Sequence, residues 1–185
     1  MTDASAEGVL AAWLADVRRR LRGHRRLAER ALVQVSDADF FRALDAGSNS
    51  LSLLVQHLSG NMRSRFTDFL IADGEKPERD RDREFRPGPE NRGDLMAAWD
   101  QSWDLCLTTI ESLSPADLAR TVTISSEPHS AAGAITRHLA HAAYHVGQIV
   151  FLAKHFVGAD WQTLSIPVGG SAAYSDELRR KHQDR

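Results

Sequence analysis

The sequence predicts an all-α fold: a four-helix bundle with long connections between its helices and an irregular C-terminal tail. Four segments repeat apolar residues at steps of three and four, which places those residues on one face of a helix. No segment sustains the polar and apolar alternation that a sheet needs. The 185 residues, of which 42% are apolar and 26% charged, suit one ordinary domain that buries its own core. We expect residues 1–185 to form a single domain, with its core in about 8–157 and the tail in 158–185.

The first predicted helix carries the clearest apolar stripe, which begins at Leu10 and ends at Val35. Its members are Leu10, Leu14, Val17, Leu21, Ala28, Ala31 and Val35. Their spacing lays them along one side of a helix of about seven turns. The arginines from Arg18 to Arg26 fall outside the stripe, so we expect them on a solvated outer face, with contact to an acidic partner as the alternative. His24 falls on the stripe and is expected to be a satisfied core residue.

The second predicted helix begins near Ser50 and ends around Gly74. Its first two turns are apolar nearly all round, which indicates burial, and they contain His57. The connector before it, residues 36–49, has a Ser-Asp-Ala-Asp start that can cap a short helical turn. Residues 73–92, DGEKPERDRDREFRPGPENR, are charged and contain prolines. We expect them to form a surface loop that buries little, with a lid over a site as the alternative.

The third predicted helix extends over about residues 93–113 and the fourth over about 130–156. Trp99 and Trp103 lie at helical spacing in the third, so they are expected in the core rather than against a cofactor. Residues 121–124 alternate polar and apolar side chains too briefly to predict a sheet. The sequence after the fourth helix is typical of an irregular tail with a short helical turn.

The fourth helix contains the residues most typical of a functional site. In AITRHLAHAAYHVGQIVFLAKHF, His141 and His145 are four positions apart, which places them within about 40° of each other on one helix face. This spacing lets two imidazoles bind one ion at roughly 2.0–2.1 Å. His57 is the candidate third ligand, because it is the one histidine in a buried part of the second helix.

Three imidazoles from two helices would leave coordination positions open, which is the arrangement of a catalytic rather than a structural ion. The alternative is that His57, His141 and His145 are core or interface histidines with separate hydrogen bonds. Neutral imidazole suits several divalent metals, so zinc is the first candidate and nickel the second.

The remaining composition argues against several classes of protein. The net charge of -2 combines 23 basic and 25 acidic residues, which gives no overall field to attract nucleic acid or an anionic membrane. A single cysteine, Cys106, can form neither an internal disulfide nor a thiolate metal cluster. No stretch approaches the roughly 18 apolar residues that span a bilayer, and the N-terminus does not resemble a secretion signal. We therefore expect a cytoplasmic protein.

Four segments together resemble one known family: HLSGNMRSRFTDF, DGEKPERDRDREF, RHLAHAAYHVGQIVFLAK and WQTLSIP. They are similar to the DinB/YfiT-like superfamily of metalloenzymes, in a bacterial branch of largely uncharacterised function. The resemblance extends from roughly Leu10 to Ser171. It implies a four-helix bundle with one ligand on the second helix and an HxxxH pair on the fourth, which correspond to His57, His141 and His145.

The segment HAAYHVGQ, which begins at His141, also matches the family pattern H-x-x-x-H-x-G-Q. Gln148 could therefore hydrogen-bond near the site, and Asn61, one turn beyond His57, is a second candidate for supporting a ligand. His138 is extra relative to the pattern. It stands as a fourth ligand, a group that supports the ligands or a pocket base, and these alternatives stay open.

Characterised relatives in the superfamily include transferases and isomerases that use low-molecular-weight thiols such as bacillithiol or mycothiol. The resemblance thus implies a metal-dependent thiol S-transferase, or a hydrolase, that acts on a small electrophile, because a cation lowers the pKa of a bound thiol or water. The alternative is a non-catalytic metal-binding stress or interaction protein. It is favoured by the lack of an obvious carboxylate beside the histidines to act as general base. Relatives commonly form dimers, so the resemblance also implies a homodimer.

Overall fold

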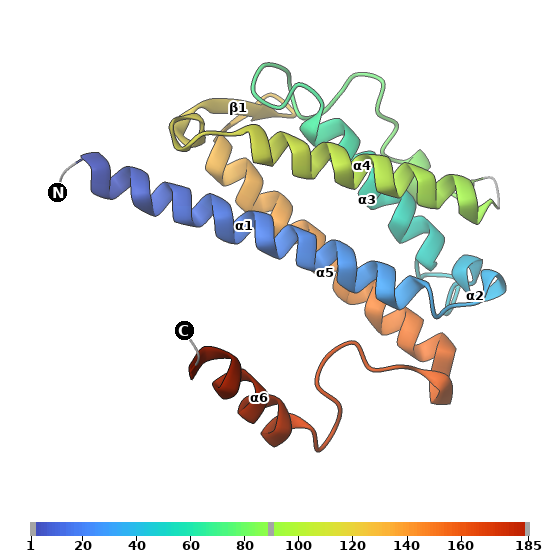
Figure 1. Cartoon of the computed structure of the whole chain (residues 1–185). Helices are drawn as coiled ribbons and strands as arrows, with labels where there is room; N and C mark the ends of the chain where they lie inside the picture. The colour runs from blue at the N-terminus through green and yellow to red at the C-terminus, as the bar shows by residue number, and fades with distance from the viewer. Residues whose placement is uncertain (1–2, 89–90, 184–185) are drawn as a thin grey trace.

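The computed structural model describes residues 3–88 and 91–183, and its main body is a bundle of four long helices (Figure 1). The long helices are α1 (Asp3–Leu32), α3 (Leu51–Phe66), α4 (Arg92–Ser112) and α5 (Ala131–Val157). The shorter elements are α2 (Asp37–Phe41), η1 (Arg83–Phe85), η2 (Pro115–Ala119), β1 (Thr121–Ile124), β2 (Glu127–Ser130), η3 (Gly158–Asp160) and α6 (Ser171–Gln183). Helix α3 packs most extensively on α4, and α1 on α5. The predicted all-α bundle is confirmed.

Polar side chains mark where three of the long helices begin. Ser50 accepts a hydrogen bond from the backbone N–H of the third residue of α3, and Asn91 and Ser130 do the same for α4 and α5. Each of these side chains satisfies a backbone donor that has no partner inside its helix. The helix starts predicted from the sequence are therefore correct to within about two residues.

The apolar stripes meet in a common core. Along α1 the predicted stripe is buried from Leu14 onward, whereas Leu10 near the start is 38% exposed. Trp99 and Trp103 of α4 are fully buried and contact each other edge to face, with ring centroids 5.6 Å apart. The prediction that these tryptophans belong to the core is confirmed. Among the residues that the structure describes, no helix is both long enough and apolar enough to cross a membrane.

The arginines of α1 do not all face solvent, so that prediction is wrong in part. Arg18 donates to the backbone carbonyls of Ile110 and Leu113, at 3.0 and 3.1 Å, where α4 ends. Arg25 pairs with Asp100 and Asp104 of α4. The acidic partner of this basic face is therefore a helix of the same chain, and a cation is favourable beside the carbonyls at the end of a helix. His24 is half-buried, and the described residues offer its ring no hydrogen bond.

The second helix ends at Phe66, eight residues before the predicted end at Gly74. The backbone turns away because Thr67 is extended and Asp68 has a positive φ of 51°. The segment that follows reaches the hairpin, where the N–H of Gly74 donates to the carbonyl of Thr123 at 2.7 Å. A tertiary contact thus replaces the last two turns of the predicted helix.

Strands β1 and β2 form a two-stranded antiparallel hairpin, although the alternation of polar and apolar residues there was too short to predict a sheet. Val122 and Ile124 bury their side chains against the bundle, and the turn residues Ser125 and Ser126 both have positive φ. The carboxylate of Asp73 accepts hydrogen bonds from both turn N–H groups, at 2.8 and 2.7 Å. A hairpin this small is marginal alone, so this contact and the buried side chains stabilise it.

The C-terminal tail contains a 13-residue helix, α6, rather than the predicted short turn. Figure 1 shows α6 apart from the four long helices, and its described side chains are exposed. The segment before it is held to the turn after α1 by hydrogen bonds between Gln34 and the backbone of Gln162. Tyr174 and Leu178 are its large apolar residues, so its sequence shows little of the periodicity that predicts a packed helix.

Candidate metal centre

The three predicted ligands lie together between α3 and α5. The Nε2 atom of His141 is 3.1 Å from the Nε2 atom of His57 and 3.1 Å from that of His145. The candidate ligand atoms of all three residues lie within 4.8 Å of one another. Two nitrogens bound to one ion at about 2.1 Å are separated by roughly 2.9–3.4 Å, depending on the angle at the ion. In this three-histidine cluster (His57, His141 and His145), the two distances of 3.1 Å therefore suit ligands of a shared cation.

The opposite ring nitrogens of two of these histidines are held by acceptors. His57 Nδ1 lies 2.8 Å from a carboxylate oxygen of Glu84, and His145 Nδ1 lies 2.9 Å from the amide oxygen of Gln148. Each Nδ1 must then carry the proton and donate it, which leaves the lone pair on Nε2. Both imidazoles are fixed in the tautomer and orientation of a metal ligand.

The same arrangement is poorly satisfied without a cation. The Nε2 lone pairs of His57 and His145 point to the same place. Only an N–H on His141 Nε2 could be donated to them, and a single N–H satisfies only one of the two lone pairs. His141 Nδ1 is buried and has no hydrogen-bond partner among the described residues. Burial, followed by the neighbouring His145 and His57, lowers the pKa of His141 to about 3. The imidazole is therefore neutral at neutral pH, as a metal ligand must be.

Glu84 was not identified from the sequence, where the acids of the loop were too numerous to choose among. It is 8% exposed, and its carboxylate accepts from His57 and from Arg79 Nε and Nη2 at 2.7 and 2.8 Å. Burial opposes ionisation, but the hydrogen bonds from His57 and Arg79 hold the pKa of Glu84 below its ordinary value. The expectation that no carboxylate lies beside the histidines is wrong, because the chain brings one from 27 residues away.

The loop that supplies Glu84 is anchored rather than fully solvated. Gln56, beside His57, donates to the backbone carbonyls of Arg83 and Glu84 at 3.0 and 2.9 Å. The ring of Phe85 lies 4.5 Å from that of His57, centroid to centroid. Phe85 is the one large apolar residue in the charged stretch 73–92, and it is the sequence signal that could have located this contact.

Gly60, three residues after His57 in α3, makes room for the carboxylate of Glu84. A Cβ placed on Gly60 would lie 2.8 Å from the carboxyl carbon of Glu84, closer than real Cβ atoms approach. A glycine costs a helix some stability relative to alanine. Its presence in the middle of α3 is explained by the close approach of Glu84.

A cavity of about 400 Å³ opens beside the histidines. Its walls come from α3, α5, β1 and the anchored loop, and they combine aromatic and aliphatic side chains with several arginines. Tyr144, 64% exposed, stands at the cavity with its ring 4.9 Å from that of His145. The volume matches that of sites for small molecules.

The other predicted site residues have different surroundings. Gln148 contacts the candidate ligand His145, whereas Asn61 is buried and lines the cavity without a hydrogen bond to the cluster among the described residues. His138 also lines the cavity, but its Nε2 lies 3.6 Å from Cys106 Sγ and its ring packs edge to face on Phe66. The three-histidine cluster does not include it.

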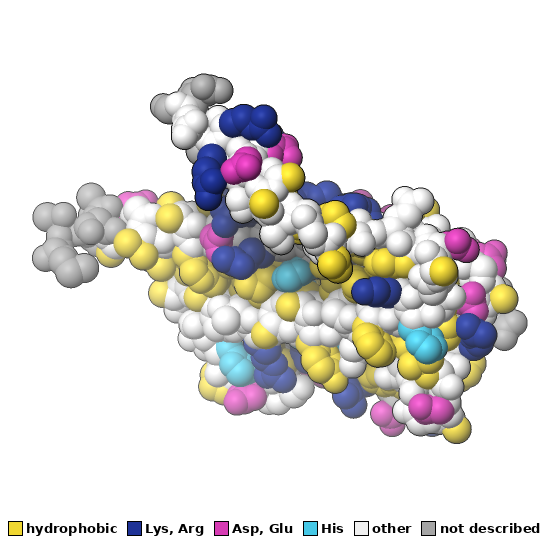
Figure 2. Space-filling view, turned by 90° about the horizontal axis from the view of Figure 1, so that it is seen from below, with side chains coloured by type: hydrophobic (Ala, Val, Ile, Leu, Met, Phe, Trp, Pro, Cys, Tyr) yellow, Lys and Arg dark blue, Asp and Glu magenta, His cyan; other side chains and the backbone are white. Residues whose placement is uncertain are grey.

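Charges of both signs are mixed with apolar side chains over the face seen in Figure 2, as the balanced composition suggests.

No curated protein matches the chain at a significant level. Residues 9–170 match the model of one family, DUF1572, which is described as "Protein of unknown function (DUF1572)". This match covers most of the chain and includes the three histidines and Glu84. The chain therefore belongs to the DUF1572 family.

Proposed function

We propose that this protein is a metal-dependent enzyme that binds one divalent ion through His57, His141 and His145, and that its family is a branch of the DinB/YfiT-like superfamily. The observation that carries this proposal is the convergence of three Nε2 atoms at the wall of a cavity. Glu84 and Gln148 support it, because they orient two of the imidazoles as ligands.

The chemistry follows from the donor set. A divalent ion held by three neutral imidazoles lowers the pKa of a thiol or water and polarises an electrophile. In the chain itself, Glu84 holds the proton on His57 Nδ1 and increases the basicity of Nε2. Phe66, Phe69 and Ile124 line the cavity and reduce its access to water. We assign the reaction to thiol S-transfer or hydrolysis of a small electrophile, with zinc as the first candidate metal and nickel as the second.

A non-catalytic metal-binding stress or interaction protein is the alternative function. It requires the histidines but not the cavity beside them, so the cavity favours the enzyme. A low-molecular-weight thiol as co-substrate and a homodimer remain predictions from the family resemblance.

The test is elemental analysis of untagged protein purified without chelators. We expect about one ion per chain in the wild type, and loss of that ion in His57→Ala and His145→Ala. His155→Ala is the matched control, because His155 is an exposed histidine on the same helix α5. Absence of an ion from the wild type, or its retention in His57→Ala, would contradict the proposal.

Turnover separates the enzyme from the alternative. Model electrophiles are incubated with a panel of thiols, or with water alone, and product is measured for the wild type, His145→Ala and His155→Ala. The enzyme predicts product with the wild type and the control but not with His145→Ala. A fully loaded wild type that forms no product with any thiol or with water would favour the non-catalytic protein.

A further inference from the structure

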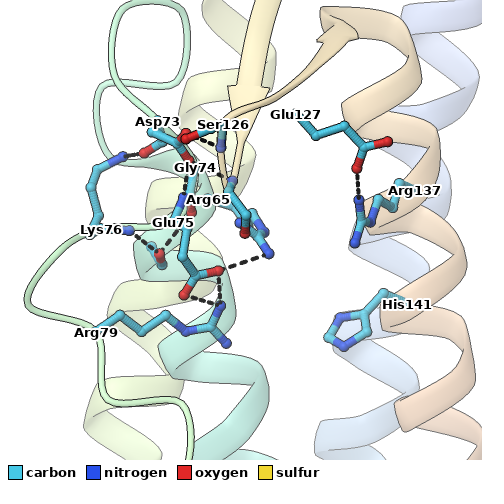
Figure 3. Close-up of polar contacts among 12 residues, drawn as sticks. Arg65, Asp73, Gly74, Glu75, Lys76, Arg79, Ser126, Glu127, Arg137 and His141 are labelled. Atoms are coloured by element: carbon cyan, nitrogen blue, oxygen red, sulfur yellow. Dashed lines mark hydrogen bonds and ion pairs between the residues drawn. The ribbon is translucent and has the colours of Figure 1, made fainter.

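The end of the cavity near the hairpin is lined by arginines that the metal site does not use. Arg65 follows His57 by two turns of α3, and Arg137 precedes His141 by one turn of α5. Figure 3 shows Arg65 and Arg137 extending toward each other from the two helices, with His141 next to Arg137 along α5. Both arginines are thus displaced from the histidines in the same direction.

Each nitrogen of Arg79, a third arginine at the cavity, has an acceptor within the protein. Its Nε and Nη2 donate to Glu84, and its Nη1 donates to Glu75. Arg79 is therefore paired with two carboxylates and supports the metal centre through Glu84.

Arg65 and Arg137 retain free donors. Arg65 Nη2 lies 3.2 Å from Glu75, a carboxylate that it shares with Arg79, while its Nη1 is buried without a partner among the described residues (Figure 3). Arg137 comes no closer than 4.0 Å to the carboxylate of Glu127. A buried charged donor without an acceptor is costly, so an acceptor in the cavity would be strongly favoured.

The acidic side chains nearby fill this role only in part, because Glu75 is shared between Arg65 and Arg79. Among the described residues that line the cavity there is no aspartate or glutamate. The carboxylate of Asp73 is occupied by the N–H groups of Glu75, Ser125 and Ser126. The hairpin end of the cavity is therefore cationic and offers two guanidinium groups on opposite walls.

From these contacts we infer that the cavity takes a small acidic molecule, whose carboxylate or phosphate group binds between Arg65 and Arg137. Guanidinium groups bind such oxyanions through paired, charge-assisted hydrogen bonds. The assignment of this molecule as the substrate rests on the proposed function; the oxyanion site itself does not require the metal. One turn of α5, about 6 Å along the helix axis, separates Arg137 from His141.

The experiment is calorimetric titration of the protein with inorganic phosphate and with malonate, and with neutral malonamide as a negative probe. Arg137→Gln is the principal variant, because the Arg137 side chain is 56% exposed and its removal leaves the core intact. Arg63→Gln is the matched control, since Arg63 is exposed on α3 and lies outside this cavity. Arg65→Gln tests the buried partner, with its circular dichroism and melting temperature measured alongside.

We expect phosphate, malonate or both to bind the wild type and Arg63→Gln alike, and to bind Arg137→Gln and Arg65→Gln about tenfold more weakly. Preference for one probe then identifies the acidic group. The inference is overturned if neither anion binds the wild type, if malonamide binds as well as malonate, or if Arg137→Gln keeps wild-type affinity.

Titration of His57→Ala makes a failure of this inference distinguishable from a failure of the metal proposal. Anion binding that survives in His57→Ala but is weakened by Arg137→Gln places the oxyanion on the arginines. Binding that is lost in His57→Ala and unchanged in Arg137→Gln would assign the anion to the metal and overturn the arginine site.

Discussion

Two places in this bundle bury imidazoles, and they differ in what holds the ring. In the three-histidine cluster, His57 and His145 each donate Nδ1–H to an oxygen, so their Nε2 atoms meet at a shared point. At His138 the Nε2 atom contacts Cys106, and Nδ1 has no partner among the described residues. Burial alone therefore does not make a histidine a ligand. For His57 and His145 the acceptor on the opposite ring nitrogen makes the difference, whereas His141, whose Nδ1 has no partner among the described residues, is placed by its Nε2 atom, 3.1 Å from theirs.

The largest effect is expected from removing the carboxylate that distinguishes the two places. Glu84→Ala should weaken metal binding by about 10–100-fold, because His57 loses the acceptor that fixes its tautomer. Competition with a chromogenic chelator measures the affinity. Glu78→Ala, an exposed acid in the same loop, should leave it unchanged. If His138→Phe weakens metal binding as much as Glu84→Ala, the proposed difference between His138 and the three-histidine cluster is contradicted.

A second prediction concerns the space that Glu84 occupies. Gly60→Ala should destabilise the fold by about 2 kcal/mol, because the new Cβ meets the Glu84 carboxylate and either the side chain or α3 must shift. Gly23→Ala in α1 is the control, since its Cβ would meet nothing within 4 Å. That variant should gain up to about 1 kcal/mol from better helix propensity. Urea unfolding measures both, and an equal gain in the two variants would show that Glu84 does not need this glycine.

The smallest effect concerns the pH dependence of stability at His138. Burial, followed by the nearby His141, Arg65 and His24, lowers the pKa of His138 from its ordinary value of 6.5 to about 3. Cys106, whose pKa burial raises, faces the same ring as a neutral thiol. The unfolded chain therefore binds a proton below pH 6.5 that the folded chain does not, and the contribution of His138 to stability is lost as pH falls from 6.5 toward 3.

Urea unfolding of chelator-treated protein tests this sign. Between pH 6.5 and 5.5 the wild type should lose about 1 kcal/mol more stability than His138→Leu, since one proton corresponds to about 1.4 kcal/mol per pH unit. His155→Leu, at an exposed position, should follow the wild type. Identical slopes of stability against pH for the wild type and His138→Leu would mean that His138 is protonated equally in the folded and unfolded chains.

Much of the fold was predictable because its signals are local. The steps of three and four that place Leu14, Val17 and Leu21 on one face depend only on helix geometry, and the core confirms them. The pair His141 and His145 is set by the same geometry. Helix α6 was missed because a helix that packs on little needs no apolar stripe, and the hairpin was missed because its turn is held by Asp73, some 50 residues before it.

The sequence by itself determined four amphipathic helices and two candidate ligands on one helix face, because residues one turn apart are neighbours in any α-helix. The tertiary structure alone decided that Glu84 meets His57 and that Arg65 faces Arg137 across the cavity. Such pairings follow no period along the chain. They depend on how the loop and α5 pack on α3, and many charged residues of this sequence could have met instead.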